Sequence, residues 1–407
     1  MSGSGAPVET APDSVAYVVE RFPELSQTFI MNELRELHRR GIRPRVFALY
    51  PPSAADSTAD DLPFELLPSL SKDPLSAVGI VLRILVTHPL RLLHGLALLA
   101  RGPSRLRVHA FGKALFLHAR LGEGQTRLHA HFARASASAA LYAALIGDHT
   151  FSFTAHGSDV FMRPLDLDYK LRHADVAVTV CQYNRRFIEK RWPGLGRVEV
   201  VPCGVDTGYF AEEELPAGTF RILAVGRLVP QKGFADLVRA CGVLHDQGVE
   251  FACRIIGDGP LRDQLSGLIA DLGLAGKVEL TGPAPAEAVR AALEWTTCLC
   301  LPAVIGPDGE RDSQPVVVKE AMATGRPVVV THEVGLPEIV DSSVGRLVDP
   351  GRPDLLAEAL AELAAAPPGA LGAMGHAGRL RVESELSLAK QVDRLLGCWR
   401  ETPSPHL

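Results

Sequence analysis

The sequence predicts an α/β protein with two doubly wound, Rossmann-like domains, each built on a parallel sheet, facing each other across a central cleft. Short apolar runs rich in Val and Ile alternate with amphipathic helical stretches along the 407 residues, as in parallel sheets covered by helices. The alternation lapses at 203–218 into Gly, Pro and acidic residues, which is typical of a domain boundary. We expect an N-terminal domain over 1–205, a linker over 206–218 and a C-terminal domain over 219–380. A helix in the final segment, 381–407, is expected to pack back toward the N-terminal domain.

The expected strands are short runs of β-branched and other apolar residues bounded by turn residues. In the first half they lie at 15–19, 46–49, 128–131, 151–155, 176–180 and 198–201, with helices at 27–40, 136–145 and 182–190. In the second half the strands lie at 221–225, 251–256, 278–281, 298–301, 327–331 and 346–348. Helices are expected at 235–247, 261–272, 286–293, 316–323, 354–365 and 386–399.

Composition excludes several classes of protein. Apolar residues make up 47 % of the chain and charged residues 22 %, which argues against wholesale disorder and against a small disulfide scaffold. The net charge is 42 − 47 = −5, so no global positive field attracts nucleic acid. The seven cysteines are scattered through apolar runs, as buried thiols are in a reducing compartment. Since residues 1–13 do not resemble a signal peptide, we expect a cytoplasmic protein.

An apolar stretch over 75–107 suggests contact with a membrane surface. Arg83, His88 and Arg91 interrupt the stretch, so it lacks the run of about 18 uncharged apolar residues that spanning a bilayer requires. Leucines beside arginines suit helices lying peripherally on an anionic membrane. They also suit core-facing helices with an arginine-lined solvent face, and we favour this second interpretation.

Polar side chains follow the carboxyl ends of several expected strands, where α/β sheets bind their ligands. One strand runs into Gly226, and Arg227 and Lys232 follow before the next helix. The glycine lets the backbone approach a ligand, and two cations beside a helix N-terminus form an anion site suited to phosphate. The alternative is an exposed basic loop without function.

Two carboxylates, Asp312 and Glu320, lie on either side of the start of another expected helix. A diphosphate could dock on the free N–H groups at that helix start, beside Asp312. Glu320, two helical turns further on, could accept hydrogen bonds from two vicinal ribose hydroxyls. Its apolar sequence neighbours make an unpaired carboxylate costly, which favours a functional partner over a plain surface glutamate.

Histidines in the first half offer a further set of candidates. His156 immediately follows an expected strand and could donate a hydrogen bond to a sugar hydroxyl. His129 and His131 share one face of a strand and could form a metal pair, but no third ligand has a convincing spacing, so packing is favoured. Asp166 and Asp168 resemble a metal-binding Asp-x-Asp motif, yet they lead into a helix, and we discount them.

These motifs resemble those of the retaining glycosyltransferases of the GT-B fold, family four, in particular the bacterial exopolysaccharide and colanic-acid branch. The resemblance covers nearly the whole chain. The matching motifs, in order, are Phe22 to Ile30, His129 to Phe132, Ala155 to Asp159, Val201 to Asp206, Gly226-Arg227 with Lys232-Gly233, Gly257 to Pro260, and the glutamate motif ending at Glu320.

The resemblance implies a role for each candidate residue. Arg227 and Lys232, with Gly226 beside them, would bind the nucleotide diphosphate and neutralise the leaving group. Glu320 would hold the ribose hydroxyls. The residues expected to contact the transferred sugar are His156, near the reacting carbon, and Asp312, Ser313, Gln314, Pro315 and Val316. Such enzymes use no metal ion or other cofactor, because the two cations and the helix dipole stabilise the leaving group.

Several residues depart from the family pattern. Asp312 stands where the family usually has Glu, Ser313 where it has Gly, and Cys203 where it has Asn. These differences bear on the identity of the donor sugar more than on the reaction class.

The resemblance also implies a role for two residues of an N-terminal loop. Ser26 and Thr28 would face the phosphates from this loop.

We therefore expect an enzyme that transfers a sugar from a nucleoside diphosphate, UDP first, to an acceptor hydroxyl with retention of configuration. No carboxylate is a convincing nucleophile, and the resemblance implies a front-face mechanism. The acceptor is a lipid-linked saccharide or a soluble secondary-metabolite scaffold. Two alternatives stay open: a GT-B nucleotide-sugar epimerase, and a degenerate nucleotide-sugar binding protein, which Asp312 and Cys203 motivate.

Overall fold

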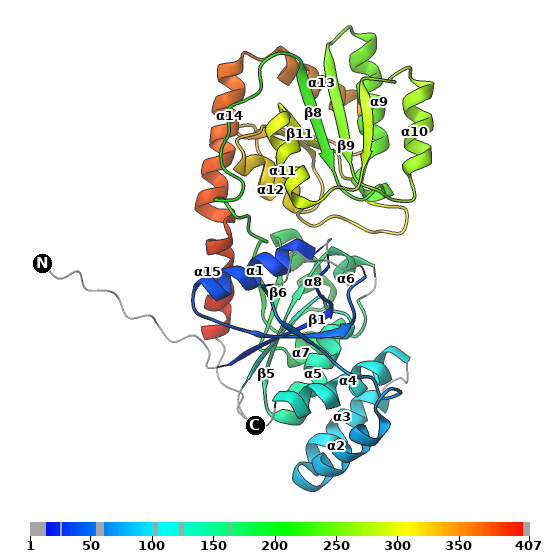
Figure 1. The fold of residues 1–407 in the computed structure, drawn as a ribbon, viewed down its shortest axis with the longest axis vertical. Helices are drawn as coiled ribbons and strands as arrows, with labels where there is room; N and C mark the ends of the chain where they lie inside the picture. The colour runs from blue at the N-terminus through cyan, green and yellow to red at the C-terminus, as the bar shows by residue number, and fades with distance from the viewer. Residues whose placement is uncertain are drawn as a thin grey trace, which may run out of the picture.

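Two parallel sheets, one in each half of the chain, form the two lobes of the molecule (Figure 1). The computed structural model describes residues 14–24, 27–53, 61–100, 105–121, 126–162 and 164–401. The N-terminal sheet has the strand order β3-β2-β1-β4-β5-β6-β7, and the C-terminal sheet has the order β10-β9-β8-β11-β12-β13. All strand pairs in both sheets are parallel, which confirms the doubly wound architecture.

Most of the strands lie on short apolar runs of the sequence. Those of the N-terminal sheet are β1 (Val15–Arg21), β2 (Arg45–Tyr50), β3 (Phe64–Leu66), β4 (Arg127–His131), β5 (Thr150–Ala155), β6 (Val176–Thr179) and β7 (Val198–Val200). Those of the C-terminal sheet are β8 (Phe220–Val225), β9 (Phe251–Ile256), β10 (Val278–Gly282), β11 (Cys298–Leu301), β12 (Val328–Thr331) and β13 (Gly345–Val348). Every residue of β4, β5, β6, β11 and β12 is buried, as in sheets covered by helices on both faces.

Helices cover both sheets. In the N-terminal lobe they are α1 (Thr28–Arg39), α2 (Pro74–Thr87), α3 (Pro89–Ala100), α4 (Arg105–Leu121), α5 (Ala135–Gly147), α6 (Gly157–Phe161), α7 (Leu167–His173) and α8 (Gln182–Arg191). In the C-terminal lobe they are α9 (Phe234–Asp246), α10 (Arg262–Asp271), α11 (Ala286–Trp295), α12 (Val316–Ala323), α13 (Pro353–Ala365) and α14 (Pro368–Arg381). The last helix, α15 (Leu388–Arg400), lies beside the N-terminal lobe (Figure 1).

The helices α2 and α3 correct one expectation from the sequence. Their solvent face carries leucines and valines rather than the arginine lining that we favoured, because one narrow stripe of each helix suffices to pack against the domain. The buried positions are Ala77 and Ile84 on α2 and Leu92, Gly95 and Leu98 on α3.

The chain passes between the lobes twice, and the two crossings touch. Val205 on the first pairs with Ser387 on the second as an isolated parallel bridge. The Val205 N–H donates to Leu386 O at 2.9 Å, and the Leu388 N–H donates to Val205 O at 3.0 Å. Because both crossings are bonded here, this point is a double connection between the lobes.

Beyond the crossing, α15 becomes part of the N-terminal core. Its apolar face packs in one cluster with β1 and α1. The Trp399 ring lies 5.3 Å from the ring of His129 and 6.4 Å from that of Tyr17, measured between centroids. A helix encoded at the end of the chain thus completes the core of its first domain.

Leu395→Ala should therefore destabilise the N-terminal lobe. Leu395 has no exposed surface, and removing a fully buried leucine side chain costs about 2–5 kcal/mol of unfolding free energy. Denaturant unfolding measures the loss, with the neighbouring exposed Arg394→Ala as the matched control. Equal stabilities of the two variants would contradict the role of α15 in this core.

Candidate functional site

The loop after β8 brings Lys232 beside the end of that strand. Gly226 adopts φ 157°, and a Cβ there would lie 3.0 Å from Lys232 Cε. Gly233, at φ 66°, packs so tightly that a Cβ would lie 1.8 Å from Pro302 O. Both glycines are therefore needed for the lysine to lie along the strand end and for the loop to pack against the segment after β11.

That segment, 302–315, supplies carboxylates to both cations. The Val304 N–H donates to Gln231 O at 3.0 Å, which joins the two loops. Lys232 Nζ forms an ion pair with the Asp312 carboxylate. Arg227 has a more exposed side chain than Lys232, and its Nη2 atom lies 3.7 Å from Glu310 Oε1. The phosphate-binding candidates thus face counter-charges from one loop, and an incoming anion would compete with those carboxylates.

Asp312 lies upstream of α12, which begins at Val316 with Pro315 as its N-cap residue. Its carboxylate pairs with Lys232, a contact that the sequence did not predict. Within the described residues no side chain caps α12, so N–H groups in its first turn are available to an anion. Gln314 lies just before the helix, and its side-chain oxygen accepts from Lys319 Nζ at 3.0 Å.

Glu320 is a partly buried carboxylate on α12. Among the described residues, no hydrogen bond or ion pair to its side chain is recorded, although its helix neighbours Ala321 and Met322 are fully buried. Burial raises the pKa of Glu320 to about 7, and the nearby Lys319 offsets only part of this effect. Lys319 itself donates to Cys203 O at 2.5 Å. Glu320 is therefore a desolvated acceptor that a ligand with paired hydroxyls could satisfy.

On the opposite lobe, His156 follows β5 and is partly buried. The Asp159 carboxylate accepts hydrogen bonds from the N–H groups of His156 at 3.0 Å and Ala133 at 2.8 Å, which fixes the turn into α6. Burial, together with the nearby His131, lowers the pKa of His156 to about 3. Its ring is therefore neutral near pH 7 and suited to hydrogen bonding with a hydroxyl rather than to carrying a charge.

Behind His156 lies a buried cluster that the sequence did not reveal. His131 Nδ1 lies 3.5 Å from His156 Nε2, and His131 Nε2 lies 3.1 Å from Glu33 Oε1. Glu33 also accepts from Tyr17 Oη at 2.6 Å and from the Gln391 side chain. Hydrogen bonds therefore run from α15 through Glu33 to the candidate sugar-contacting histidine.

The cluster places Glu33 where it could act as a third metal ligand beside His129 and His131. The sequence did not reveal this residue. Ligand atoms of Glu33, His129 and His131 lie within 4.8 Å of one another. However, His129 already bonds Ser152 Oγ at 2.9 Å and Thr154 Oγ1 at 3.0 Å through its two ring nitrogens. Since Glu33 is also engaged by neighbouring side chains, the geometry favours a hydrogen-bonded core network over a metal site.

The two lobes meet close to His156 and Asp312. A Cβ on Gly157 would lie 2.6 Å from Arg311 O and 2.8 Å from Ser313 Oγ. Asn184 Nδ2 donates to Ser313 Oγ at 3.0 Å. Because Gly157 follows His156 and Asp312 lies between Arg311 and Ser313, the candidates from the two lobes approach the same part of the cleft.

A second contact between the lobes caps α8. The Glu338 carboxylate accepts from the backbone N–H groups of Gln182 at 2.8 Å and Tyr183 at 2.7 Å. A carboxylate is favourable at a helix N-terminus. This contact and the Ser313–Asn184 bond were not predicted, because nothing in the sequence indicates which helix of the other lobe a loop will meet.

Of the remaining predicted residues, Thr28 is the first residue of α1, whereas Ser26 lies outside the described residues. Ser313 has a buried side chain that bonds Asn184 across the lobes, and its carbonyl accepts from the Gly335 N–H at 2.9 Å. Lys232, Asp312 and Ser313 are thus brought together, whereas Glu320 lies further along α12.

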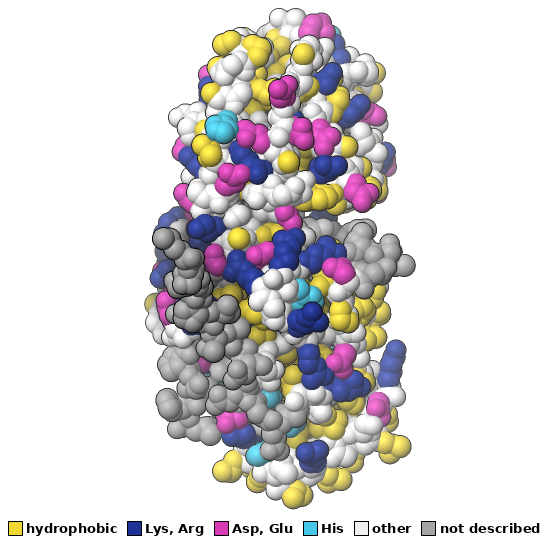
Figure 2. Space-filling model, turned by 60° about the vertical axis from the view of Figure 1, so that its left-hand side comes forward, with side chains coloured by type: hydrophobic (Ala, Val, Ile, Leu, Met, Phe, Trp, Pro, Cys, Tyr) yellow, Lys and Arg dark blue, Asp and Glu magenta, His cyan; other side chains and the backbone are white. Residues whose placement is uncertain are grey.

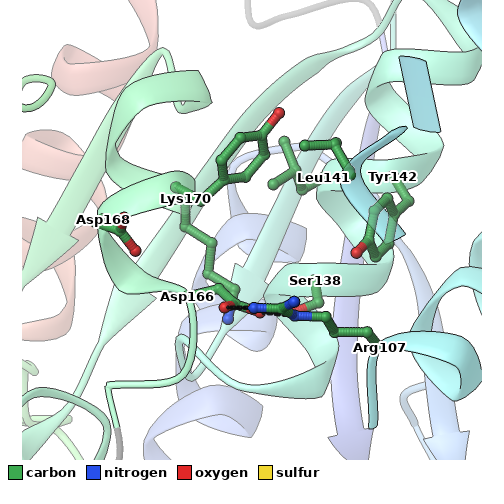
Figure 3. A pocket seen from close by; sticks show the side chains of 9 residues that line it. Arg107, Ser138, Leu141, Tyr142, Asp166, Asp168 and Lys170 are labelled. Carbon is green, nitrogen blue, oxygen red and sulfur yellow. Dashed lines mark hydrogen bonds and ion pairs between the residues drawn. The ribbon is translucent and has the colours of Figure 1, made fainter. Parts of the chain in front are cut away.

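A small pocket of about 100 Å³ lies away from this site, within the N-terminal lobe (Figure 3). The side chains of Arg107 and Asp166 meet there, with Arg107 Nε 2.8 Å from Asp166 Oδ2. Lys170 beside them donates to Ala133 O at 2.8 Å and to Leu165 O at 2.7 Å. These charged groups stabilise the helices around the pocket, and Asp166 is held by an arginine rather than arranged with Asp168 for a metal.

Two family models match the chain. Residues 26–209 match Glycosyltransferase Family 4, and residues 206–380 match Glycosyl transferases group 1. The chain is 29 % identical over 365 residues to WcaL of Escherichia coli (strain K12), named as a colanic acid biosynthesis glycosyltransferase, covering 85 % of this chain and 89 % of WcaL. It is 32 % identical over 218 residues to a GDP-mannose-dependent phosphatidylinositol monomannoside mannosyltransferase of Mycolicibacterium smegmatis, covering 51 % and 57 % of the two chains.

Solved structures share the whole fold. A glycosyltransferase from Rickettsia africae superposes with a TM-score of 0.72 at 17 % identity, covering 96 % of this chain and 98 % of that one. Anabaena HepE in complex with UDP superposes with a TM-score of 0.68 at 16 % identity, covering 95 % and 99 %. The matched families together extend from residue 26 to residue 380. The chain is therefore a GT-B glycosyltransferase, with a family 4 domain followed by a group 1 domain.

Proposed function

We propose that the protein transfers a sugar from a nucleoside diphosphate, UDP first, to a hydroxyl of a saccharide or lipid-linked acceptor. The observation that carries the proposal is the ion pair of Lys232 with Asp312 close to the other lobe. The chain neighbours of Asp312, which are Arg311 and Ser313, approach Gly157, the residue after His156. The relatives named for colanic acid and for a glycolipid mannoside support an acceptor in exopolysaccharide or glycolipid biosynthesis. The structures that contain UDP support the choice of base.

In this proposal the diphosphate replaces the carboxylates that now face the cations. Lys232 exchanges Asp312 for a phosphate oxygen, and Arg227 exchanges Glu310 in the same way. The uncapped start of α12 adds backbone N–H donors. As the bond to the sugar breaks, negative charge grows on the departing phosphate, where these groups stabilise it without a metal ion.

The nucleoside is held by Glu320. Its carboxylate has no partner recorded in the described chain and is desolvated, so two ribose hydroxyls would supply the hydrogen bonds that it lacks. This contact fixes the nucleotide along α12 and thereby sets the position of the anomeric carbon.

The reacting carbon would lie where the two lobes meet. Asp312, once released from Lys232, can accept hydrogen bonds from sugar hydroxyls, and the neutral His156 ring can bond another from the opposite side. The acceptor oxygen attacks on the face from which the phosphate departs. The sugar–phosphate bond breaks with its electron pair going to the phosphate oxygen, and this oxygen takes the acceptor proton. Because the acceptor enters on the face that the phosphate leaves, the configuration of the sugar is retained.

Lys232→Ala tests the phosphate site. Losing one preorganised charge partner of the leaving group should lower kcat/KM by about 10²–10³. Lys277→Ala, which removes a surface lysine elsewhere in the same lobe, is the control and should leave the rate unchanged. Steady-state assays with and without acceptor measure both, and unchanged kinetics in Lys232→Ala would remove this residue from the site.

The pH dependence of donor binding tests Glu320. Because the pKa of Glu320 is raised to about 7 and only the carboxylate accepts two hydroxyl bonds, affinity should rise with pH, by about tenfold from pH 6 to pH 8. A UDP-sugar is the probe, since its diphosphate carries no terminal group that titrates near pH 6. Calorimetry should find this slope absent in Glu320→Gln. The same slope in that variant would assign it to another group.

Chelation tests the absence of a metal requirement. Turnover should be unchanged after dialysis against EDTA, because cations of the protein stabilise the leaving group. Activity that is lost with EDTA and restored by Mn²⁺ would contradict this part of the mechanism.

A donor screen comes before these assays. Thermal shifts with a panel of UDP- and GDP-sugars identify the donor, since a ligand specific for the folded state raises the melting temperature. Turnover of that donor without acceptor would indicate the epimerase alternative, and binding without any turnover would indicate a degenerate binding protein.

A further inference from the structure

The helices α2 and α3 expose many large apolar side chains. Eight of the sixteen large hydrophobic side chains exposed in the described residues lie on these two helices: Leu75, Val78, Leu82, Leu85, Val86, Leu90, Leu93 and Leu96. Figure 1 places the pair at the end of the N-terminal lobe farthest from the C-terminal lobe, and Figure 2 shows hydrophobic side chains at that end. A contiguous exposed apolar face of this kind normally marks a surface that contacts a partner or a membrane.

The inner stripe of the pair already accounts for its attachment to the domain. Ile84 and Leu92 are buried against the lobe, and a Cβ on Gly95 would lie 3.1 Å from the Phe111 ring. The outer residues take no part in this packing: Val86 is 83 % exposed and Leu90 is 79 % exposed. Folding of the chain therefore does not explain why the outer face is apolar.

The charged residues of this segment are all basic. Residues 74–107 contain five arginines and neither Asp nor Glu. Since the whole chain carries −5, the rest of it carries −5 − 5 = −10. Two of these arginines have acidic partners within the lobe, since Arg91 pairs with Asp148 and Arg107 with Asp166. Arg83 lies exposed on α2 among the outer leucines, and no ion pair to it is recorded in the described residues. An apolar face with positive charge at its edge matches a surface that offers both hydrocarbon and negative charge.

We propose that α2 and α3 dock on the surface of an anionic phospholipid bilayer. The outer leucines enter the boundary between headgroups and acyl chains, and Arg83 contacts lipid phosphates. None of the helices in the described residues combines the length and hydrophobicity needed to cross a bilayer. With 14 residues, α2 is about 21 Å long against a hydrocarbon core of about 30 Å.

A second copy of the chain fits this face less well. Self-association through α2 and α3 would bring two arginine-bearing surfaces together without an acidic partner from the same segment, and like charges across an interface are unfavourable. Anionic lipid removes this repulsion. Docking goes beyond the transferase proposal, because binding to lipid can be measured without any donor or acceptor.

Vesicle co-sedimentation of the full chain tests the proposal. We expect binding to vesicles of phosphatidylcholine with about 30 mol % phosphatidylglycerol, little binding to phosphatidylcholine alone, and loss of binding in about 0.5 M NaCl. Leu82→Ser/Leu85→Ser should weaken binding by about tenfold or more. Arg83→Gln should weaken it by about fivefold.

Leu272→Ser/Leu380→Ser is the matched control, because it removes two exposed leucines from the other lobe. It should bind vesicles as the unaltered protein does, and unfolding curves of both double variants check that they are folded. Absence of binding to anionic vesicles, or equal loss in the control, overturns the proposal. Light scattering that shows a dimer dissociated by Leu82→Ser/Leu85→Ser, without vesicle binding, assigns the face to self-association instead.

Discussion

The buried carboxylate of Glu33 is the constraint around which the N-terminal lobe is organised. Burial alone would raise the pKa of Glu33, but its bonds to His131, Tyr17 and Gln391 outweigh that effect and lower the pKa. An ionised group in a core is tolerated only when its partners are in place. These partners come from β4, β1 and α15, so the charge fixes the position of the last helix and the orientation of the ring behind His156.

Each lobe carries only part of the candidate site. The C-terminal lobe offers Lys232, Arg227 and Glu320, and the N-terminal lobe offers His156. The lobes are joined by polar contacts such as the Asn184–Ser313 bond and the cap that Glu338 forms on α8. They are also joined by a small apolar cluster in which Val180 and Cys181 of the N-terminal lobe pack with Val334 of the C-terminal lobe.

The sequence predicts the features that depend on local pattern. Strands follow Val-rich runs such as β6 and β12, and the glycine-and-cation loop at Gly226 indicates an anion site, because those signals reside in consecutive residues. Glu33 was missed because its meaning depends on His131 and Gln391, which are far away in the chain.

Two further features were not predicted, for a similar reason. The partner of Asp312 is Lys232, which lies 80 residues earlier in the chain, so no local pattern indicates the ion pair. Residues 75–107 were expected to hide their leucines, because periodicity shows that a helix is apolar without showing which of its faces has a neighbour.

The ion pair between Lys232 and Asp312 has a consequence for the proposed transfer. If a diphosphate binds Lys232, it enters by anion exchange, and the aspartate would return to the lysine when the spent nucleotide departs. The lysine would then keep a counter-charge at every stage. The same exchange would ease product release, because an internal counter-ion favours discharge of the diphosphate and limits inhibition by the nucleotide that each turnover would produce.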